Sequence, residues 1–213
     1  LVDGGYVRKE IKPISLDELD SIIQPSSKKR RLQLVEDSSF RNLAAIKQMY
    51  KDLKIMKFQT CRAKHCDWAY SNAISFFMNS NTRTVFKLSY SGDTRPNIDK
   101  FAKTVGYRSD LLIHEATLDN ELEEDAIKKR HCTINEAISV SNAMEAEKLV
   151  LTHFSQRYPK LPQMDNNTPV QAKEFCFAFD GMITSFDKLG EQQEIFTLLN
   201  KVFIDEREAT EED

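Results

Sequence analysis

The order of strand-like and helix-like segments is the feature that most constrains how this chain can fold. Three segments rich in aromatic and β-branched side chains predict neighbouring strands: residues 58–63, 73–78 and 84–90. Beyond them, two buried-strand patterns, DLLIHE and KLVLTHF, alternate with three segments of helical character: 97–105, 120–130 and 133–146. Adjacent strands followed by strand–helix alternation predict mixed sheets that are covered by helices.

Further segments complete the expected organisation. A capping-box pattern predicts a short helix over residues 15–23, and apolar positions at helical spacing predict another over residues 40–53. A turn at NSNT is expected to join the second and third strands. The Asp-Gly turn at residues 180–181 predicts a hairpin, and a closing helix is expected over residues 195–203.

The composition narrows the class of protein. A length of 213 residues fits one domain, and 40% hydrophobic with 30% charged residues is ordinary for a soluble globular protein. A formal charge of −3 neither demands nor excludes nucleic acid, because binding depends on a basic face and not on the sum. No apolar run approaches the roughly 20 residues of a membrane span. Four cysteines without CxxC spacing predict free thiols in a reducing, intracellular compartment.

The two ends of the chain differ from its middle. The opening LVDGGYVRKEIKP has no initiator Met and no signal peptide, so we interpret it as a sheet edge cut from a longer polypeptide. Residues 24–38 are expected to form a mobile loop, whose four cations at 28–31 fit either a solvated loop or an import or RNA-contacting patch. The acidic tail 205–213 is expected to be disordered.

Polar side chains follow the predicted strands where each strand ends. Asp93 lies in SGDTRP after strand 84–90, and His153 follows the strand in KLVLTHF. The carboxyl ends of strands are where α/β proteins place ligands, and Gly92 lets the backbone approach closely. Imidazole and carboxylate are ligands that zinc prefers, so the pair predicts a metal site. The competing interpretations are a helix-capping aspartate and a hydrogen-bonded structural histidine.

The motif HEAT, residues 114–117, closes another strand in the same way. Burying Glu115 is unfavourable without a partner, and His131 lies 16 residues farther on, after a charged helix. A carboxylate-oriented imidazole is a standard general acid, because it holds its proton near neutral pH and donates it to a leaving oxygen. A structural His–Glu hydrogen bond at a helix start explains the pair equally well.

His65 follows the first predicted strand. Zinc binding by Cys61, His65 and Cys66 together is disfavoured, because an adjacent His-Cys pair is not zinc-finger spacing and no partner pair follows. The aromatic side chains nearby are expected in the core and not on a base-stacking surface: Trp68, Tyr70 and Phe76.

Taken in order, these segments resemble the catalytic half of tRNase Z, the tRNA 3′-processing endonuclease family, in its long eukaryotic form such as that of fungi. The resemblance runs from about Phe58 to Tyr158 through FQTCRAKHCDWAY, YSGDTRP, LLIHEATLDNELEEDA, KKRHCTINEAI and LTHFSQRY. It implies the metallo-β-lactamase fold, an αββα sandwich of two mixed sheets flanked by helices. Residues 1–213 would be the C-terminal part of such a catalytic domain.

The resemblance also implies roles for the residues singled out above. His65 would bind one zinc ion, His153 would bind the other, and Asp93 would bridge both. Glu115 would orient His131, which would donate a proton to the departing ribose oxygen or contact the scissile phosphate. The family's two zinc ions clamp that phosphate and generate the attacking hydroxide. Precursor tRNA would be cleaved to leave a tRNA 3′-hydroxyl and a 5′-phosphate on the trailer.

Three departures from the family pattern bear on activity. The HxHxDH motif, which supplies ligands to both metals and carries the candidate general base, is absent from this sequence. Ser71 replaces a usual glycine, and Cys132 replaces the usual serine of HST without being marked as a nucleophile. His114 matches the motif but is not a family metal ligand, so we expect it to be structural. The chain should be inactive unless the N-terminal remainder of the protein, on the same or a second chain, completes the site.

Two alternatives to this function stay open. Another metallo-β-lactamase-fold hydrolase would be an mRNA 3′-end nuclease or a glyoxalase-like thioesterase, although HEAT followed by the His131 motif argues against the thioesterase. A degenerate half that only scaffolds an active partner is the non-enzymatic alternative, and the retention of all five groups argues against it. The KKRR segment allows a nuclear location, and the resemblance adds mitochondria.

Overall fold

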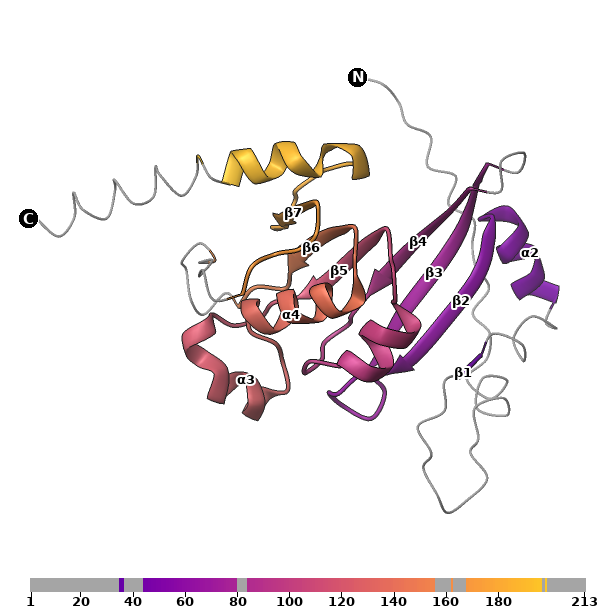
Figure 1. Ribbon diagram of the computed structural model, residues 1–213. Coiled ribbons are helices and arrows are strands. Elements are labelled where there is room, and N and C mark those ends of the chain that lie inside the picture. The colour runs from indigo at the N-terminus through magenta and orange to yellow at the C-terminus, as the bar shows by residue number, and fades with distance from the viewer. Residues whose placement is uncertain are drawn as a thin grey trace, which may run out of the picture. The chain divides into compact units, whose positions relative to one another are not determined.

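One mixed sheet organises the part of the chain that the computed structural model describes, which is residues 35–36, 44–79, 84–155, 162, 168–196 and 198. The chain divides into two compact units, residues 1–31 and 32–213, and every described residue belongs to the second. The seven strands of the sheet follow the order β1-β2-β3-β4-β5-β6-β7 (Figure 1). Among the described residues, no helix has the length and apolar character needed to span a bilayer.

The elements follow one another as strands first and strand–helix alternation later. The strands are β1 (Val35–Glu36), β2 (Ile55–Arg62), β3 (Tyr70–Asn79), β4 (Thr84–Tyr90), β5 (Leu111–Glu115), β6 (Lys148–Thr152) and β7 (Glu174–Phe177). The helices are α2 (Ala44–Asp52), η2 (Ile98–Val105), η3 (Asn120–Leu122), α3 (Glu123–Lys129), α4 (Ile134–Met144) and η4 (Phe186–Lys188), from which helical residues 189–196 continue.

The expected strands and helices in the middle of the chain are confirmed by these bounds. The closing helix begins before residue 195, and residues 199–203 lie outside the described part of the chain. The predictions for residues 15–23, 28–31 and 205–213 also lie outside it. So does the predicted loop 24–38, except for Val35 and Glu36, which pair with β2.

Strand direction decides which residues meet at one edge of the sheet. β1 to β4 pair antiparallel, whereas β4 to β7 are parallel. The register opposes Arg62, at the end of β2, to Tyr70, and opposes Tyr90, at the end of β4, to Asn72. The ends of β2, β4, β5 and β6 therefore lie along one edge. Four predicted site residues follow or close these strands: His65, Asp93, Glu115 and His153.

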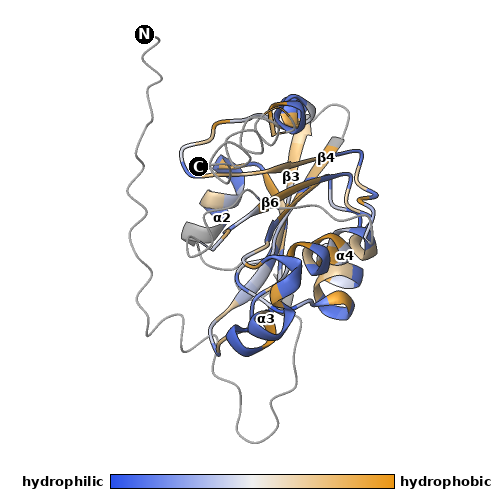
Figure 2. Ribbon diagram, turned by 90° about the vertical axis from the view of Figure 1, so that its left-hand side faces the viewer, coloured by the Kyte–Doolittle hydropathy of each residue, from blue (hydrophilic) through white to orange (hydrophobic). Residues whose placement is uncertain are grey.

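Helices η2 and α4 pack against each other and build the larger core, and α4 also contacts β5 and β6 (Figure 1). Burying each large apolar side chain there contributes about 1.5–3 kcal/mol. Figure 2 shows α3 as mostly hydrophilic, and only its Ala126 is buried. The fully buried residues of this core come from both helices and the parallel strands: Phe101, Val105, Leu112, Ile138, Val140, Met144, Leu149 and Leu151.

The hairpin predicted around residues 180–181 is wrong. Within the described residues, β7 pairs with β6 alone, and the segment after the turn forms no strand. Instead Met182 packs against a second cluster of buried residues, Val150, Cys176 and Leu189, while Ile183 is 92% exposed. Met182 thus packs on a face of the sheet and Ile183 points away from it, and the sequence pattern alone does not distinguish this arrangement from a paired strand.

Candidate metal and acid–base site

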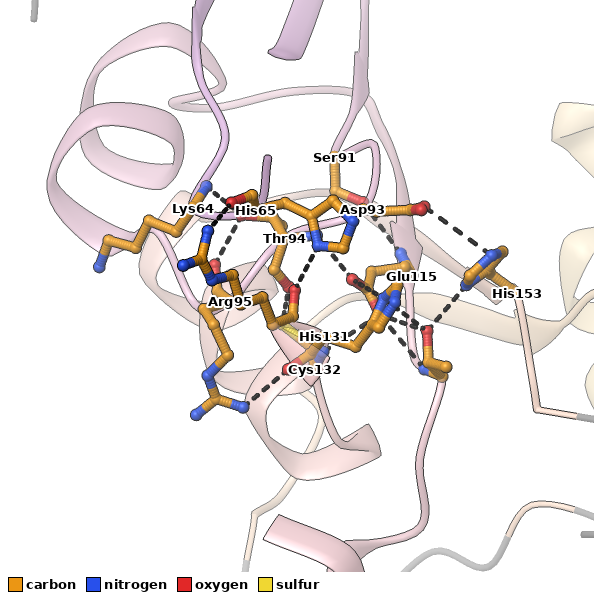
Figure 3. A network of polar contacts seen from close by, with 12 residues as sticks. Lys64, His65, Ser91, Asp93, Thr94, Arg95, Glu115, His131, Cys132 and His153 are labelled. Atoms are coloured by element: carbon orange, nitrogen blue, oxygen red, sulfur yellow. Dashed lines mark hydrogen bonds and ion pairs between the residues drawn. The ribbon is translucent and has the colours of Figure 1, made fainter. Parts of the chain in front are cut away.

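Three imidazole rings and two carboxylates meet at the edge where the strands end. His131 lies between the other two histidines, with its ring centroid 4.8 Å from that of His65 and 5.5 Å from that of His153 (Figure 3). Ligand atoms of His65, Asp93 and His131 lie within 4.8 Å of one another, and so do those of Glu115, His131 and His153. The structure therefore brings together all five side chains that the sequence singled out.

Glu115 is the buried anchor of this cluster, with its side chain only 3% exposed. Its Oε1 accepts from the Thr94 amide at 2.6 Å and from His131 Nδ1 at 3.0 Å. Its Oε2 accepts from the Thr117 hydroxyl at 2.5 Å, the Thr117 amide at 3.4 Å and the Cys132 amide at 3.1 Å. A carboxylate offers about four lone pairs, so these donors saturate it. Glu115 therefore has no free lone pair to offer a metal ion.

His131 reaches Glu115 because backbone hydrogen bonds join the two ends of the segment that contains α3. The Leu118 amide donates to the Cys132 carbonyl and the Ile134 amide to the Leu118 carbonyl, each at 3.2 Å. The turn between them holds the His131 ring against the carboxylate, with 16% of its side chain exposed. The predicted pairing is confirmed, and the ring stays open to a ligand on its other side.

His65 is held by a reciprocal contact with Arg130, which no sequence pattern indicated. The His65 Nδ1–H donates to the Arg130 carbonyl at 2.9 Å, and the Arg130 guanidinium donates to the His65 carbonyl at 2.7 Å. Because a carbonyl only accepts, Nδ1 carries a proton, and the lone pair that a metal could use is that of Nε2. Arg130 ends α3 in the left-handed conformation, with φ of 61°, which turns its carbonyl toward the ring.

Replacing Arg130 by glycine should show how much the guanidinium contact contributes to zinc binding, because it removes the side chain and keeps the left-handed backbone conformation. Glycine accepts a positive φ without strain, so the thermal midpoint of the complete protein should not fall. Loss of the guanidinium removes its bond to the His65 backbone carbonyl, while the bond from the His65 ring to the backbone carbonyl of residue 130 remains, so zinc binding should weaken by up to about tenfold. Glu145→Gly is the matched control, since Glu145 ends α4 with φ of 54° away from the site. Equal zinc affinities in the two variants, measured by chelator competition, would contradict this role.

The turn that carries Asp93 depends on close backbone packing. Gly92 has φ of +58°, and a Cβ there would lie 2.8 Å from the Tyr70 carbonyl oxygen, so the expected close approach is confirmed. The buried Ser71 hydroxyl donates to the Ser91 carbonyl at 2.6 Å. In place of the glycine usual in the family, Ser71 thus ties β3 to the turn.

The Asp93 carboxylate contrasts with that of Glu115. Its side chain is 41% exposed, and Oδ1 lies 3.8 Å from His153 Nε2 (Figure 3). No hydrogen bond to this carboxylate occurs within the described part of the chain. It does not cap a helix, because η2 begins at Ile98 with Asn97 at the N-cap. An open carboxylate beside an imidazole nitrogen suits a cation.

An Arg95–Glu136 pair, which the sequence reasoning missed, joins the turn to helix α4. The Arg95 guanidinium donates to both oxygens of Glu136 and, at 2.7 Å, to the His131 carbonyl. Glu136 also accepts from the Thr133 amide and completes the capping box of α4. The available signal was Glu136 itself, because a Thr-x-x-Glu pattern marks a helix start. Through Arg95, the turn that carries Asp93 is thereby connected to the backbone of His131 and to the start of α4.

His114 is separate from this cluster and lies in the core. Its Nδ1–H donates to the Glu115 carbonyl at 2.6 Å, and its Nε2 has no partner in the described structure. Burial lowers the pKa of His114, and the hydrogen bond to and charge of Glu115 offset this only in part. The expected structural role agrees with this position.

Stability near His114 should therefore fall as the pH drops below about 6.5. The unfolded ring takes up a proton at its ordinary pKa of about 6.5, whereas the folded ring stays neutral, so each pH unit lost below it removes up to about 1.4 kcal/mol. In His114→Leu this loss is absent. Amide hydrogen exchange of β5 in the metal-free complete protein, at pH 7.5 and 5.5, measures both. Parallel pH dependence in the two proteins would contradict the assignment.

The cysteines do not join the cluster. All four are free, and no candidate metal group among the described residues contains one. Burial raises the pKa of Cys61 to about 11, which disfavours the thiolate that a metal requires. Burial, followed by the charges of Glu115 and Glu136, also raises the pKa of Cys132, whose thiol donates to the Thr94 carbonyl at 3.0 Å. Cys132 is a packing residue.

The prediction that Trp68 lies in the core is wrong, because its side chain is 71% exposed in this chain. The Arg62 guanidinium lies 5.9 Å from the Trp68 ring centroid and 5.2 Å from that of Tyr70. The loop that carries His65 projects Trp68 outward, which an aromatic residue in a strand-rich segment did not reveal.

The chain has the metallo-β-lactamase fold class, and its described residues form one mixed sheet of the predicted two-sheet sandwich, with histidines and carboxylates gathered where the strands end. The chain is 60% identical over 211 residues to ribonuclease Z of Saccharomyces cerevisiae, covering 97% of the chain and 25% of that relative. The crystal structure of a long-form RNase Z from yeast matches with 62% sequence identity and a TM-score of 0.72, covering 82% of this chain and 25% of that one. The chain belongs to the ribonuclease Z family.

A more distant relative shares a shorter region. The chain is 35% identical over 158 residues to zinc phosphodiesterase ELAC protein 2 of Homo sapiens, covering 74% of the chain and 18% of that relative. No protein-family profile matches. The chain spans a quarter or less of the length of these relatives. The sequence resemblance to the long form of the family is thereby confirmed.

The donor set fits a zinc-type metal. Imidazole nitrogens and carboxylate oxygens are ligands of zinc, and His65, Asp93 and His153 offer them at one edge of the sheet. The hydrogen bond from His65 Nδ1 leaves Nε2 of that ring as its donor atom. Glu115 does not belong to this donor set, because its oxygens already accept hydrogen bonds. The set therefore consists of side chains with free ligand atoms, which are those of His65, Asp93 and His153.

Proposed function

We propose that the complete protein to which this chain belongs is a zinc-dependent endoribonuclease that removes the 3′ trailer from precursor tRNA and leaves a tRNA 3′-hydroxyl. The observation that supports this most strongly is the convergence of five polar side chains at one sheet edge in a member of the ribonuclease Z family. The sequence contains no HxHxDH motif, so the remaining ligands would come from the rest of the protein. Residues 1–213 are then part of one catalytic domain, with a nuclear and mitochondrial location by family resemblance.

The proposed metal ligands are the open donors of the cluster. His65 would hold one zinc, His153 the other, and Asp93 would bridge the pair. When bound, a zinc pair neutralises charge on the phosphate and activates the attacking water. The chain's own part is to fix these donors: Arg130 holds the His65 ring, and the Gly92 turn holds Asp93.

The proposed general acid is His131. Its Nδ1–H is engaged by Glu115, so the proton that it can release lies on Nε2 of the imidazolium ring. The Glu115 carboxylate would compensate the charge of that ring from the buried side, and 16% of the His131 side chain is exposed. The proton would pass to the departing ribose oxygen, which leaves the tRNA with its 3′-hydroxyl.

Zinc analysis and cleavage assays on the complete protein test this function. It should contain about two zinc ions per site and cut precursor tRNA just after the discriminator base. Zinc content near zero would favour the scaffold alternative. Bound zinc without tRNA cleavage, but with hydrolysis of another ester, would assign the protein to a different branch of the fold class.

A further inference from the structure

The Thr117 hydroxyl lies between a proposed metal ligand and the carboxylate that orients the proposed acid. Its Oγ1 is 2.8 Å from His153 Nδ1, 2.5 Å from Glu115 Oε2 and 3.3 Å from His131 Nδ1. We infer that Thr117 is a positioning residue that fixes the tautomer of His153 and so presents Nε2 of that ring to a metal. This inference rests on the proposed zinc site and specifies how the chain prepares one of its ligands.

A count of protons assigns the direction of each hydrogen bond. The hydroxyl has one proton, and a carboxylate can only accept, so the Thr117 proton goes to Glu115 Oε2. The Thr117 oxygen then has no proton left for His153 and can only accept a hydrogen bond from that ring. Nδ1 of His153 must therefore donate its proton to that oxygen. A neutral imidazole protonated on Nδ1 carries its lone pair on Nε2, the nitrogen 3.8 Å from Asp93 Oδ1.

The opposite arrangement conflicts with the other donors around Glu115. For the Thr117 hydroxyl to donate to His153, Oε2 would need its own proton to donate back to Thr117. Yet Oε2 also faces the Cys132 amide at 3.1 Å, and Oε1 faces the Thr94 amide at 2.6 Å. Backbone amides cannot reverse their direction, so both Glu115 oxygens act as acceptors here, and the Thr117 hydroxyl is one of their donors.

The backbone holds this geometry in place. The Ala116 amide donates to the Thr152 carbonyl at 2.8 Å, and the Ser155 amide donates to the Thr117 carbonyl at 2.9 Å, so the ends of β5 and β6 stay paired around the two residues. His153 itself has φ of 65°, a left-handed conformation that few residues other than glycine adopt. Neighbouring contacts must stabilise it, and the hydroxyl of Thr117 is one of them.

Isosteric replacement of Thr117 by valine in the complete protein tests the inference. Valine keeps the shape and removes the hydroxyl, so zinc binding at the His153 site should weaken by about 10–100-fold in a chelator competition. One zinc per molecule should leave first, because the His65 ring is held independently by Arg130. The Thr117→Ser variant keeps a hydroxyl and should restore affinity to within about threefold of the original protein.

The Thr104→Val variant is the matched control, because the Thr104 hydroxyl donates to the Asp99 carbonyl at 2.7 Å at an exposed position of η2, outside the site. Nitrogen-15 NMR of the metal-free protein reads the tautomer directly: the Nδ1–H form of His153 should dominate in Thr117→Ser and lose its dominance in Thr117→Val. Zinc affinity in Thr117→Val equal to that of the control, or an unchanged tautomer, would overturn the inference. Neither measurement involves RNA, so a failure of the proposed tRNA cleavage would be recognised separately.

Discussion

His131→Ala is expected to lower the rate of precursor-tRNA cleavage by about 10²–10⁴-fold in the complete protein while zinc stays bound. General acid catalysis by a positioned side chain contributes about that factor. Zinc should remain because the donors assigned to the metals are His65, Asp93 and His153, and Nδ1 of His131 is engaged by Glu115. Single-turnover cleavage and zinc content, measured on the same preparation, check both parts.

A double-mutant cycle with Glu115→Gln shows whether His131 acts with its partner. If Glu115 acts on the cleavage rate only through the His131 ring, adding Glu115→Gln to His131→Ala should change that rate by less than about threefold. A larger change would show the second effect of Glu115, which runs through Thr117 to His153. Glu115→Gln alone should lower both rate and thermal stability, because an amide NH₂ would face backbone donors such as the Cys132 amide. Cleavage that persists in His131→Ala would refute the assignment of His131 as the acid.

Asp93→Ala is expected to remove zinc and to lower cleavage at least about 10³-fold, since metal ions supply several kcal/mol of transition-state stabilisation. The carboxylate faces His153 Nε2 and is open on its other side, so its loss removes a donor that no neighbouring carboxylate can replace. Glu115 cannot substitute, because its oxygens already accept from five donors. Zinc content by mass spectrometry is the primary measurement.

The control for this variant is Asp99→Ala, an exposed aspartate at the start of η2 on the same connection. It should keep both zinc and cleavage activity. Full zinc occupancy in Asp93→Ala, or an equal loss in both variants, would rule out the proposed bridging role. The fold itself should survive in either case, because neither side chain belongs to the buried cores.

Most strands of the sheet could be predicted from the sequence. Runs of β-branched and aromatic residues favour strands, as in β2, β3 and β4, and short apolar runs favour buried strands, as in β5 and β6. The prediction failed after β7, where Met182 packs on a face of the sheet and the segment does not add a strand to it. It also placed Trp68 in the core, because an aromatic residue between strands looks the same in sequence whether its loop projects inward or outward.

For the site, the sequence by itself determined which groups are present: the histidines, Asp93 and Glu115 stand in motifs whose order matches the family. Only the tertiary structure decided which of these side chains have their polar atoms occupied by hydrogen bonds and which keep them free. Glu115 is closed because backbone amides from Thr94, Thr117 and Cys132 converge on it, whereas the Asp93 side chain is 41% exposed and accepts no hydrogen bond from the described residues. Residue types fix which atoms can donate or accept, whereas the partners that use those atoms come from segments distant in sequence, and only folding brings them together.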